Sequence, residues 1–286
     1  MDKKTLFSKL RILNLKPRFR SSNRHVGNAR STIKGTGMSF SEVREYHFGD
    51  EVRTIDWNVT ARYNVPHVKI FEEEKEQHFL IVLDSSTSNM FSENGISKWD
   101  KQIEVAAMIA FTAWKQNDHF GLLIFSDKIE LYLPFSKGRM HFYATIDKLL
   151  TYRPGITRTR LEVPFEWLSK EKLPRSTIFF ASDFLSNLSI SDQVKRVVFR
   201  HKLFFLCVRN KEEEVLPDVG WVQVENFESG RKTWVNTSSE KTRFFYRDFF
   251  DKQTIQLDQL SVDNGIKWKK LFTDENAYQL LNSLYQ

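Results

Sequence analysis

The chain has 286 residues, of which 41% are hydrophobic and 14% aromatic, so it can bury a sizeable core and is not a disordered protein. Its single cysteine, Cys207, excludes an internal disulfide and a cysteine-based zinc cluster. Because Cys207 stands in an apolar run, we expect it to be a buried core residue. The net charge is +7, and residues 1–34 hold ten Lys or Arg against one Asp, so the rest of the chain is close to neutral.

The first predicted segment, residues 1–34, is a basic arm. Such an arm contacts an anionic membrane, nucleic acid or an acidic protein, or remains a solvated tail. The spacing of Leu6, Leu10 and Leu13 among lysines favours a membrane-surface or partner helix, and the two aromatic residues of the arm are too few to favour nucleic acid. The sequence shows no signal peptide and no run of about 18 apolar residues. We therefore expect a cytoplasmic protein, with the arm as an alternative contact to the inner membrane.

Three further segments follow in chain order. Residues 35–75 combine turn signals with short apolar alternations, which predicts a small strand-rich module. Residues 76–210 alternate short apolar runs with amphipathic stretches, which is typical of an α/β, Rossmann-like domain with a mostly parallel central sheet and helices on both faces. Its predicted strands are 79–83, 120–125, 129–133 (antiparallel), 177–181 and 203–208, and its predicted helices are 99–115, 140–152, 161–168 and 191–201.

Residues 211–286 predict a C-terminal extension packed on this core. It begins with an acidic connector at 212–217. A hairpin of 221–227 with 233–235 follows, then a helix over 239–262, a strand over 266–272 and a helix over 274–285.

Oxygen-bearing side chains follow the first buried strand of the central region. Asp84, Ser86 and Ser88 lie at i, i+2 and i+4, so they can point the same way as the chain leaves the strand. Asp183 ends another predicted strand at the same edge of the sheet, where ligands of open α/β sheets bind. A loop hydroxyl from Thr157 or Thr159 can complete the set. Carboxylates and hydroxyls are ligands that Mg²⁺ prefers, so this edge predicts a Mg²⁺ (or Mn²⁺) site.

The same residues favour binding over catalysis. A divalent ion held mostly by neutral hydroxyls keeps much of its charge and favours an external carboxylate. No general base or nucleophile stands beside the motif, and neither phosphate-binding glycine loops nor hydrolase motifs occur. A metal-assisted phosphoesterase remains an alternative, although Ser86 occupies the position where an aspartyl-phosphate enzyme has a second acid.

Residues 35–76 carry a long charged motif. It includes the hallmark residues Arg44, Gly49, Asp50, Arg53, Asp56, Trp57 and Arg62, followed by Lys69 and an acidic run at 72–74. This motif closely resembles the hallmark of the bacterial domain of unknown function 58 family. Its charges are spaced to form ion pairs that fasten the module to the core, with Trp57 buried between them.

The resemblance implies a von Willebrand factor A-like domain with a metal-ion-dependent adhesion site. Asp84, Ser86, Ser88 and Asp183 match that site's pattern. In the second loop this chain departs from the family pattern: alignment on Leu161 makes Thr159 the ligand, which we prefer, whereas alignment on Gly155 makes it Thr157. The neighbouring Arg158 and Arg160 would repel a metal but can bind an acidic partner.

The resemblance also implies a partner, because the family is commonly encoded beside MoxR-type AAA+ ATPases. The resulting hypothesis is a non-enzymatic, metal-dependent protein-binding adaptor or chaperone-like cofactor of such an ATPase. The sequence identifies neither the client protein nor the oligomeric state.

Overall fold

The computed structural model describes residues 3–13, 38–73, 76–90, 92–93, 95–155, 158–186, 192–225 and 232–279. Two compact units divide the chain. Unit 1 contains residues 1–21 and 77–286, and unit 2 contains residues 22–76. Each is described by itself.

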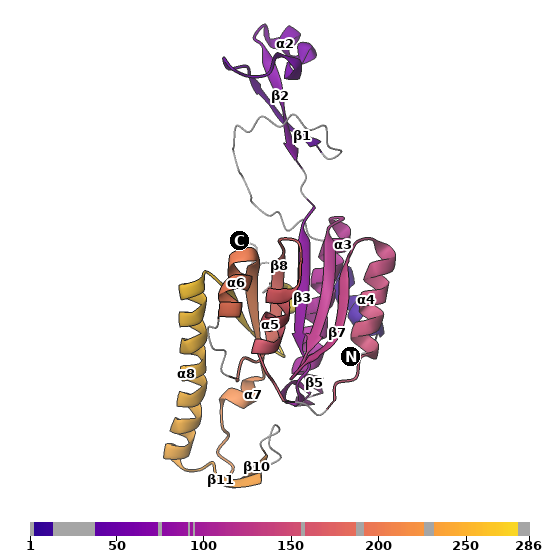
Figure 1. The fold of residues 1–286 in the computed structure, drawn as a ribbon. Coiled ribbons are helices and arrows are strands. Elements are labelled where there is room, and N and C mark those ends of the chain that lie inside the picture. Colours follow the sequence, from indigo (N-terminus) through magenta and orange to yellow (C-terminus); the bar gives the residue numbers. More distant parts are fainter. Residues whose placement is uncertain are drawn as a thin grey trace. The chain divides into compact units, whose positions relative to one another are not determined.

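Unit 1 is built on a six-stranded sheet (Figure 1). The strand order is β12-β9-β8-β3-β6-β7, and every neighbouring pair is parallel except β6 with the edge strand β7. Its strands are β3 (His78–Asp84), β6 (His119–Phe125), β7 (Ile129–Ser136), β8 (Thr177–Ser182), β9 (Lys202–Arg209) and β12 (Lys267–Phe272). The α/β class, the parallel sheet and the antiparallel strand after β6 are therefore confirmed.

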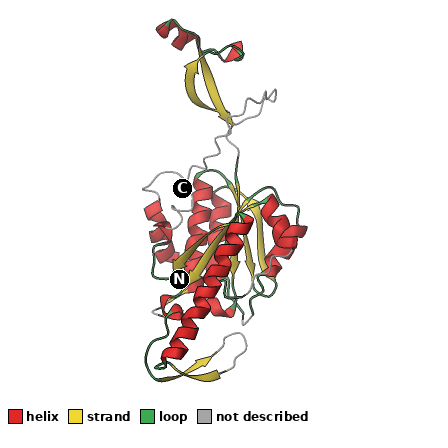
Figure 2. Ribbon diagram, turned by 90° about the vertical axis from the view of Figure 1, so that its left-hand side faces the viewer, coloured by secondary structure: helices red, strands yellow, loops and turns green. Residues whose placement is uncertain are grey.

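Helices cover both faces of this sheet (Figure 2). On one face, α1 (Lys3–Leu13), α3 (Lys98–Lys115) and α4 (Arg139–Thr151) pack on alternate strand residues such as Ile81 and Phe179. On the other, α5 (Glu162–Lys170), α6 (Asp192–Arg200) and α8 (Glu240–Asn264) pack on the intervening residues such as Val82 and Phe180. Strand side chains alternate between faces, so continuous apolar strands such as β3 fill both cores.

Short elements connect or extend these layers. They are the 3-10 helix η2 (Thr87–Asn89), the hairpin of β4 (Ser92–Glu93) and β5 (Ile96–Ser97), the short helix α7 (Lys211–Glu214), and the hairpin of β10 (Trp221–Glu225) and β11 (Lys232–Asn236). Ser97 begins α3 with a capping box in which it and Asp100 exchange hydrogen bonds. Gly265, at φ +64°, ends α8 in the left-handed conformation expected of a glycine stop.

The N-terminal segment differs from the predicted arm. Residues 3–13 form α1, whose Leu6 and Leu10 are fully buried in the core beside α3, and Lys9 forms an ion pair with Glu104 at 2.6 Å. The apolar spacing therefore serves the protein's own core, so residues 3–13 are a packed helix of unit 1 and not part of a separate arm. Residues 14–34 of the predicted arm lie outside the described residues.

The C-terminal segment is also more than an extension. β12 pairs in parallel with β9 along its whole length, from Lys267 opposite Phe204 to Phe272 opposite Arg209. The sheet of unit 1 therefore does not end at residue 210, and the predicted boundary there is wrong. The strand and helix bounds agree with prediction to within two residues, except that β7 continues to Ser136, three residues past the predicted end at 133. The predicted helix over 274–285 lies partly outside the described residues.

Unit 2 is a long hairpin with a helical tip. β1 (Met38–Glu45) pairs antiparallel with β2 (His67–Glu73), and the connection contains the 3-10 helix η1 (Val52–Thr54) and α2 (Trp57–Tyr63). Asp56 begins α2 by accepting hydrogen bonds from the N–H groups of Asn58 and Val59. Among the described residues, no helix of either unit is both long and apolar enough to span a membrane.

Candidate metal and partner-binding site

The candidate site lies where the chain changes direction across the sheet. β3 leads to β6 and β7 on one side, whereas β8, β9 and β12 are added on the other. The carboxyl ends of β3 and β8 therefore flank the topological switch point, which is where open α/β sheets bind ligands. Asp84 is the last residue of β3 and Asp183 directly follows β8, so the parallel pairing of these strands brings the two carboxylates together.

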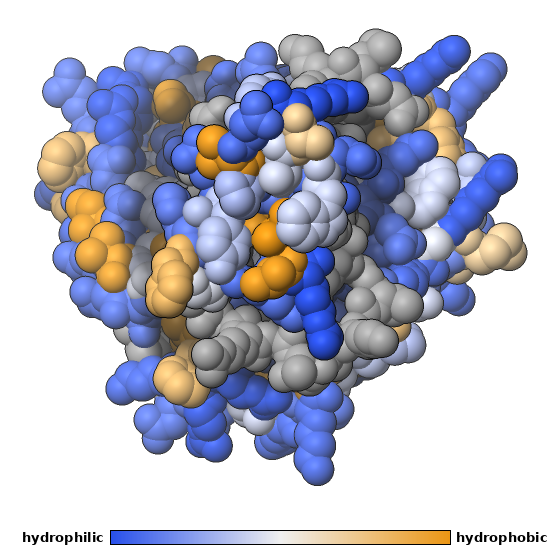
Figure 3. All heavy atoms as spheres, turned by 90° about the horizontal axis from the view of Figure 1, so that it is seen from above, coloured by the Kyte–Doolittle hydropathy of each residue, from blue (hydrophilic) through white to orange (hydrophobic). Residues whose placement is uncertain are grey.

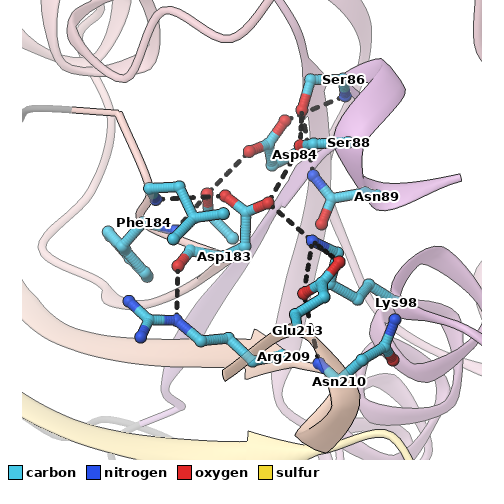
Figure 4. Close-up of polar contacts among 12 residues, drawn as sticks. Asp84, Ser86, Ser88, Asn89, Lys98, Asp183, Phe184, Arg209, Asn210 and Glu213 are labelled. Carbon is cyan, nitrogen blue, oxygen red and sulfur yellow. Dashed lines mark hydrogen bonds and ion pairs between the residues drawn. The ribbon is translucent and has the colours of Figure 1, made fainter. Parts of the chain in front are cut away.

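Asp84 is a fully buried carboxylate with neutral hydrogen-bond partners only (Figure 4). Its Oδ1 accepts from the Ser86 N–H at 2.9 Å and its Oδ2 from the Ser182 hydroxyl at 2.7 Å. Within the described chain, no Lys, Arg or His forms an ion pair with it. Burial, and then the nearby charge of Asp183, raise the pKa of Asp84 to about 6. Asp84 is thus a buried acid that lacks a counter-charge.

The Ser-rich loop presents two hydroxyls beside Asp84. The Ser86 and Ser88 hydroxyl oxygens lie 3.3 Å apart, and the Asn89 amide donates to the Ser86 hydroxyl at 3.0 Å. Ser85 points elsewhere, since its hydroxyl donates to the Phe125 carbonyl at 2.9 Å. The predicted i, i+2, i+4 convergence therefore agrees with the positions of the side chains.

Asp183 has a counter-charge of its own. Its Oδ2 accepts from the Ser88 hydroxyl and from the Lys98 ammonium, each at 2.9 Å, and its Oδ1 accepts from the Leu185 N–H. Burial opposes ionisation, but the Lys98 charge and these hydrogen bonds lower the pKa of Asp183 below its usual value. Burial likewise acts to lower the pKa of Lys98, yet the charges of Asp183 and Glu213 raise it. Lys98 and Asp183 are therefore an ionised pair.

Further ion pairs extend this cluster, and the sequence analysis predicted none of them. Lys98 also contacts Glu213 at 3.0 Å. The buried Arg209 pairs with Glu214 at 3.1 Å and donates to the Asp183 carbonyl at 3.1 Å. The acidic run at 212–214 is the signal that could have revealed them, but it was interpreted as a connector rather than as the short helix α7.

The second loop contributes less than expected. Thr159 lies in the segment that passes the end of β6, where the Arg160 N–H donates to the Ser126 carbonyl at 3.2 Å. Its side chain shares no hydrogen bond with Asp84, Ser86, Ser88 or Asp183 in the described part of the chain. Arg158 and Arg160 are both exposed. The alternative ligand Thr157 lies outside the described residues.

These donors fit a hard divalent cation. No group of three or more His, Cys, Asp or Glu suited to a metal occurs in the described segments. Asp84, Ser86 and Ser88 instead offer one carboxylate and two hydroxyls, the oxygen ligands that suit Mg²⁺. Asp183 lies beside them and differs from Asp84 in that the Lys98 ammonium already compensates its charge, while its Oδ2 accepts from the Ser88 hydroxyl.

Comparison with known proteins identifies the family. The family described as "Protein of unknown function DUF58" matches residues 42–255, which is most of the chain. The chain belongs to this family. The uncharacterized proteins Rv1480 of Mycobacterium tuberculosis and Mb1516 of Mycobacterium bovis are each 29% identical to this DUF58 protein over 232 residues, covering 80% of this chain and 73% of theirs.

Solved structures are similar at lower identity. The conserved hypothetical protein BatB from Bacteroides thetaiotaomicron matches with a TM-score of 0.49 and 15% identity, covering 73% of this chain and 96% of BatB. An aerotolerance-related membrane protein from Bacteroides fragilis matches with a TM-score of 0.47 and 13% identity, covering 72% of this chain and 96% of that protein.

The hallmark charges of this DUF58 chain form ion pairs inside unit 2. Arg44 holds Asp50 with two hydrogen bonds of 2.7 and 2.8 Å, and Asp50 also accepts from the His47 N–H. The Arg44 hydrogen bond, followed by that of His47, lowers the pKa of Asp50 to about 2. Gly49, at φ +107°, makes the intervening turn, where a side chain would be strained.

Other hallmark residues differ from the prediction. Asp56 caps α2 and pairs with Lys69 at 3.3 Å rather than with an arginine. Arg53 and Arg62 are exposed and form no ion pair in the described residues. Trp57 is 67% exposed, so unit 2 by itself does not bury this ring, and its burial between the module and the core stays a prediction. The strand pair and tip helix place it on the surface of a unit too small to enclose it.

Proposed function

We propose that unit 1 is a von Willebrand factor A-type domain that binds a partner protein through a divalent cation, and that it has no enzymatic activity. The observation that carries the proposal is the buried Asp84 carboxylate without a counter-charge, beside the Ser86 and Ser88 hydroxyls. An isolated buried carboxylate costs free energy, so a cation at this point would stabilise the fold. The position of Asp84 and Asp183 at the switch point supports the same assignment.

Asp84, Ser86 and Ser88 would hold the ion directly, and Asp183 would orient Ser88. A bound Mg²⁺ would supply a Lewis-acidic centre able to take a carboxylate from outside the chain. Lys98 already compensates the charges of Asp183 and Glu213, so Asp84 is the carboxylate of this site whose charge is left for a bound cation to compensate. The exposed Arg158 and Arg160 stand in the neighbouring loop, where they would contact the acidic surface that brings such a carboxylate.

The family assignment suggests the partner. We propose a MoxR-type AAA+ ATPase, with this chain as its adaptor or chaperone-like cofactor. Reversal of Arg158 or Arg160 to Glu should weaken a metal-dependent complex without unfolding the protein, because an acidic partner would then meet a like charge. EDTA should dissociate the same complex.

Three serine variants test the site, with one of them as a matched control. Mg²⁺ or Mn²⁺ should raise the melting temperature of the wild type, since a ligand of the folded state stabilises it. Ser86→Ala and Ser88→Ala should lose this increase, as should Asp84→Ala. Ser85→Ala should keep it, because Ser85 is a buried neighbour whose hydroxyl faces Phe125. Equal metal responses in Ser85→Ala and Ser86→Ala would contradict the assignment.

A further inference from the structure

The opposite edge of the same sheet carries an unusual concentration of positive charge. Seven exposed cations lie in α5 and α6 and in the segments that follow these helices. We call them the basic patch: Lys170, Lys172, Arg175, Lys195, Arg196, Arg200 and Lys202. Glu171 is the one carboxylate within residues 170–175 and 195–202. The charge of unit 1 therefore varies strongly over its surface, although the chain beyond the N-terminal segment is nearly neutral as a whole.

The contacts of α6 bring the two stretches together. Val194 and Val197 are buried against the sheet, and α5 packs in the same core through Phe165 and Leu168. The Arg200 guanidinium donates to the carbonyls of Glu171 and Leu173, at 3.5 and 3.3 Å, and so joins the last turn of α6 to the segment after α5. The cations thus form one surface and not two.

No carboxylate of the described segments compensates the charge of the basic patch. In the segments that the structure describes, none of its seven cations forms an ion pair, and Lys195 makes no side-chain hydrogen bond. The neighbouring His201 is buried, and burial, followed by the charges of Arg200 and Arg175, lowers its pKa to about 4. Exposed like charges repel one another, so an external anion would relieve this repulsion.

An apolar side chain stands among these cations. Phe199 is 89% exposed, and it borders a shallow hollow of about 390 Å³ together with Ser169, Lys195, Arg196 and Arg200. On a helix, positions i, i+1, i+4 and i+5 share one face, so Lys195, Arg196, Phe199 and Arg200 all point away from the core. The space-filling view from above shows a largely hydrophilic surface with separate apolar side chains (Figure 3).

We propose that the basic patch and Phe199 form a docking surface for anionic phospholipid membranes. Lys and Arg bind lipid phosphates while their apolar stems lie along the interface, and Phe199 enters the boundary between headgroups and acyl chains. A single projecting phenyl ring suits this role, because single-stranded nucleic acid is usually bound by several aromatic rings that stack on successive bases. The hollow beside Phe199 provides room for a phosphate-bearing headgroup.

This orientation has a consequence for the candidate metal site. Asp84 and Asp183 lie at the carboxyl ends of β3 and β8, whereas the basic patch lies at the other ends. β8 has six residues, so roughly 20 Å separates the two edges. A protein docked through the basic patch would hold the metal site facing away from the lipid, where a protein partner can reach it.

Vesicle sedimentation with the full chain tests the proposal. The wild type should bind vesicles of phosphatidylcholine with a quarter phosphatidylglycerol, but not pure phosphatidylcholine, and binding should fall when salt rises from about 0.1 to about 0.5 M. Each cation near an anionic surface contributes about a fivefold factor, so the double variant Lys195→Glu/Arg196→Glu should lose roughly 25-fold or more. Phe199→Ser should lose several-fold.

Matched controls separate the patch from the rest of the chain. Lys128→Glu changes an exposed cation at the carboxyl edge, and Phe244→Ser changes an exposed aromatic of α8. Both should bind like the wild type. Because the Lys195 side chain forms no ion pair or hydrogen bond in the described segments, Lys195→Ala is a milder variant that keeps the fold if the double variant does not, and unchanged melting temperatures check this.

Three results would overturn the proposal. The first is no binding of anionic vesicles by the wild type. The second is equal loss in Lys195→Glu/Arg196→Glu and in Lys128→Glu, which would mean that net charge or the N-terminal segment binds the lipid. In the third, the patch variants lose binding to a labelled single-stranded oligonucleotide but keep vesicle binding, which would make the patch a nucleic-acid surface.

Discussion

The two edges of the central sheet in unit 1 both carry many charged side chains, but they hold them in opposite ways. At the carboxyl edge, Lys98 and Arg209 are fully buried, and each has a carboxylate partner. At the amino edge, the cations of the basic patch are exposed and form no ion pairs in the described segments.

The free-energy cost of removing a charge from water explains the difference. A buried cation such as Lys98 or Arg209 needs a partner and hydrogen bonds to compensate its lost hydration, so these residues and their carboxylates form an ordered network. An exposed charge keeps its water and needs no partner, so it remains available to a ligand. The first arrangement fixes the geometry of a site, and the second provides a surface. Mutations should therefore affect stability at one edge and binding at the other.

The largest expected effect is that of Lys98→Met. This substitution leaves Asp183 and Glu213 without their shared counter-ion in a buried position, which should lower the free energy of unfolding by about 3–5 kcal/mol. Urea denaturation of both proteins measures the difference. Lys195→Met at the amino edge is the matched control and should change stability by about 0.5 kcal/mol or less. Similar urea midpoints for Lys98→Met and Lys195→Met would show that charges at the two edges do not differ in their contribution to stability.

The second-largest expected effect is a loss of stability in acid, caused by His201. This ring is buried at the amino edge, with its Nδ1 accepting from the Ser176 N–H, and its pKa is lowered to about 4 by burial and then by Arg200 and Arg175. Between pH 6.5 and 4 the unfolded chain binds a proton that the folded one does not, so stability falls as the pH falls through this window. From pH 7 to 5 the loss should be about 1–2 kcal/mol.

His201→Asn provides the control for that slope. An asparagine oxygen can accept the Ser176 hydrogen bond but cannot titrate. The variant should lose less stability than the wild type between pH 7 and 5, whatever its stability at pH 7. If the free energy of unfolding falls equally in the wild type and in His201→Asn between pH 7 and 5, His201 does not cause the acid response.

These sites differ in how far the sequence revealed them. Asp84 and Asp183 were predictable because each ends an apolar strand, and parallel strands end at a common edge. Strand alternation also predicted that Ser86 and Ser88 converge. The central elements were found because periodicity is a local property: a strand predicted over 79–83 is β3, His78–Asp84.

What failed depends on contacts distant in sequence. Lys98 stands one residue before the predicted helix, 85 positions from Asp183, and no local pattern says that they meet. The helical spacing of Leu6 and Leu10 was noticed, but spacing does not say whether a core or a membrane covers the apolar face. The basic patch was missed because its two stretches are about 25 residues apart and only the packing of α5 on α6 joins them.

A smaller effect is expected from Arg175→Ala. It removes one of the two charges that lower the pKa of His201, so that pKa should rise towards its usual value. Relief of repulsion within the basic patch should also stabilise the protein slightly, by a few tenths of a kcal/mol. NMR titration of the His201 ring measures the first change and thermal unfolding the second. Lys128→Ala should change neither, and a fall in the pKa of His201 in Arg175→Ala would contradict the electrostatic account of the amino edge.

The smallest effect is expected in the rate at which a reagent modifies the Cys207 thiol. This rate tests whether the carboxyl edge opens locally in the folded protein. This residue is fully buried beside Asp183, whose carbonyl lies 3.5 Å from its Sγ, and burial raises the pKa of the thiol to about 11. At pH 8 only about one thiol in a thousand would be ionised even if reagent reached it. A thiol reagent should therefore modify native protein no faster than the protein unfolds. Lys98→Met should speed the reaction only in proportion to its lower stability, whereas faster modification of the stable wild type would show that this edge opens locally and that its charges are not held as one network.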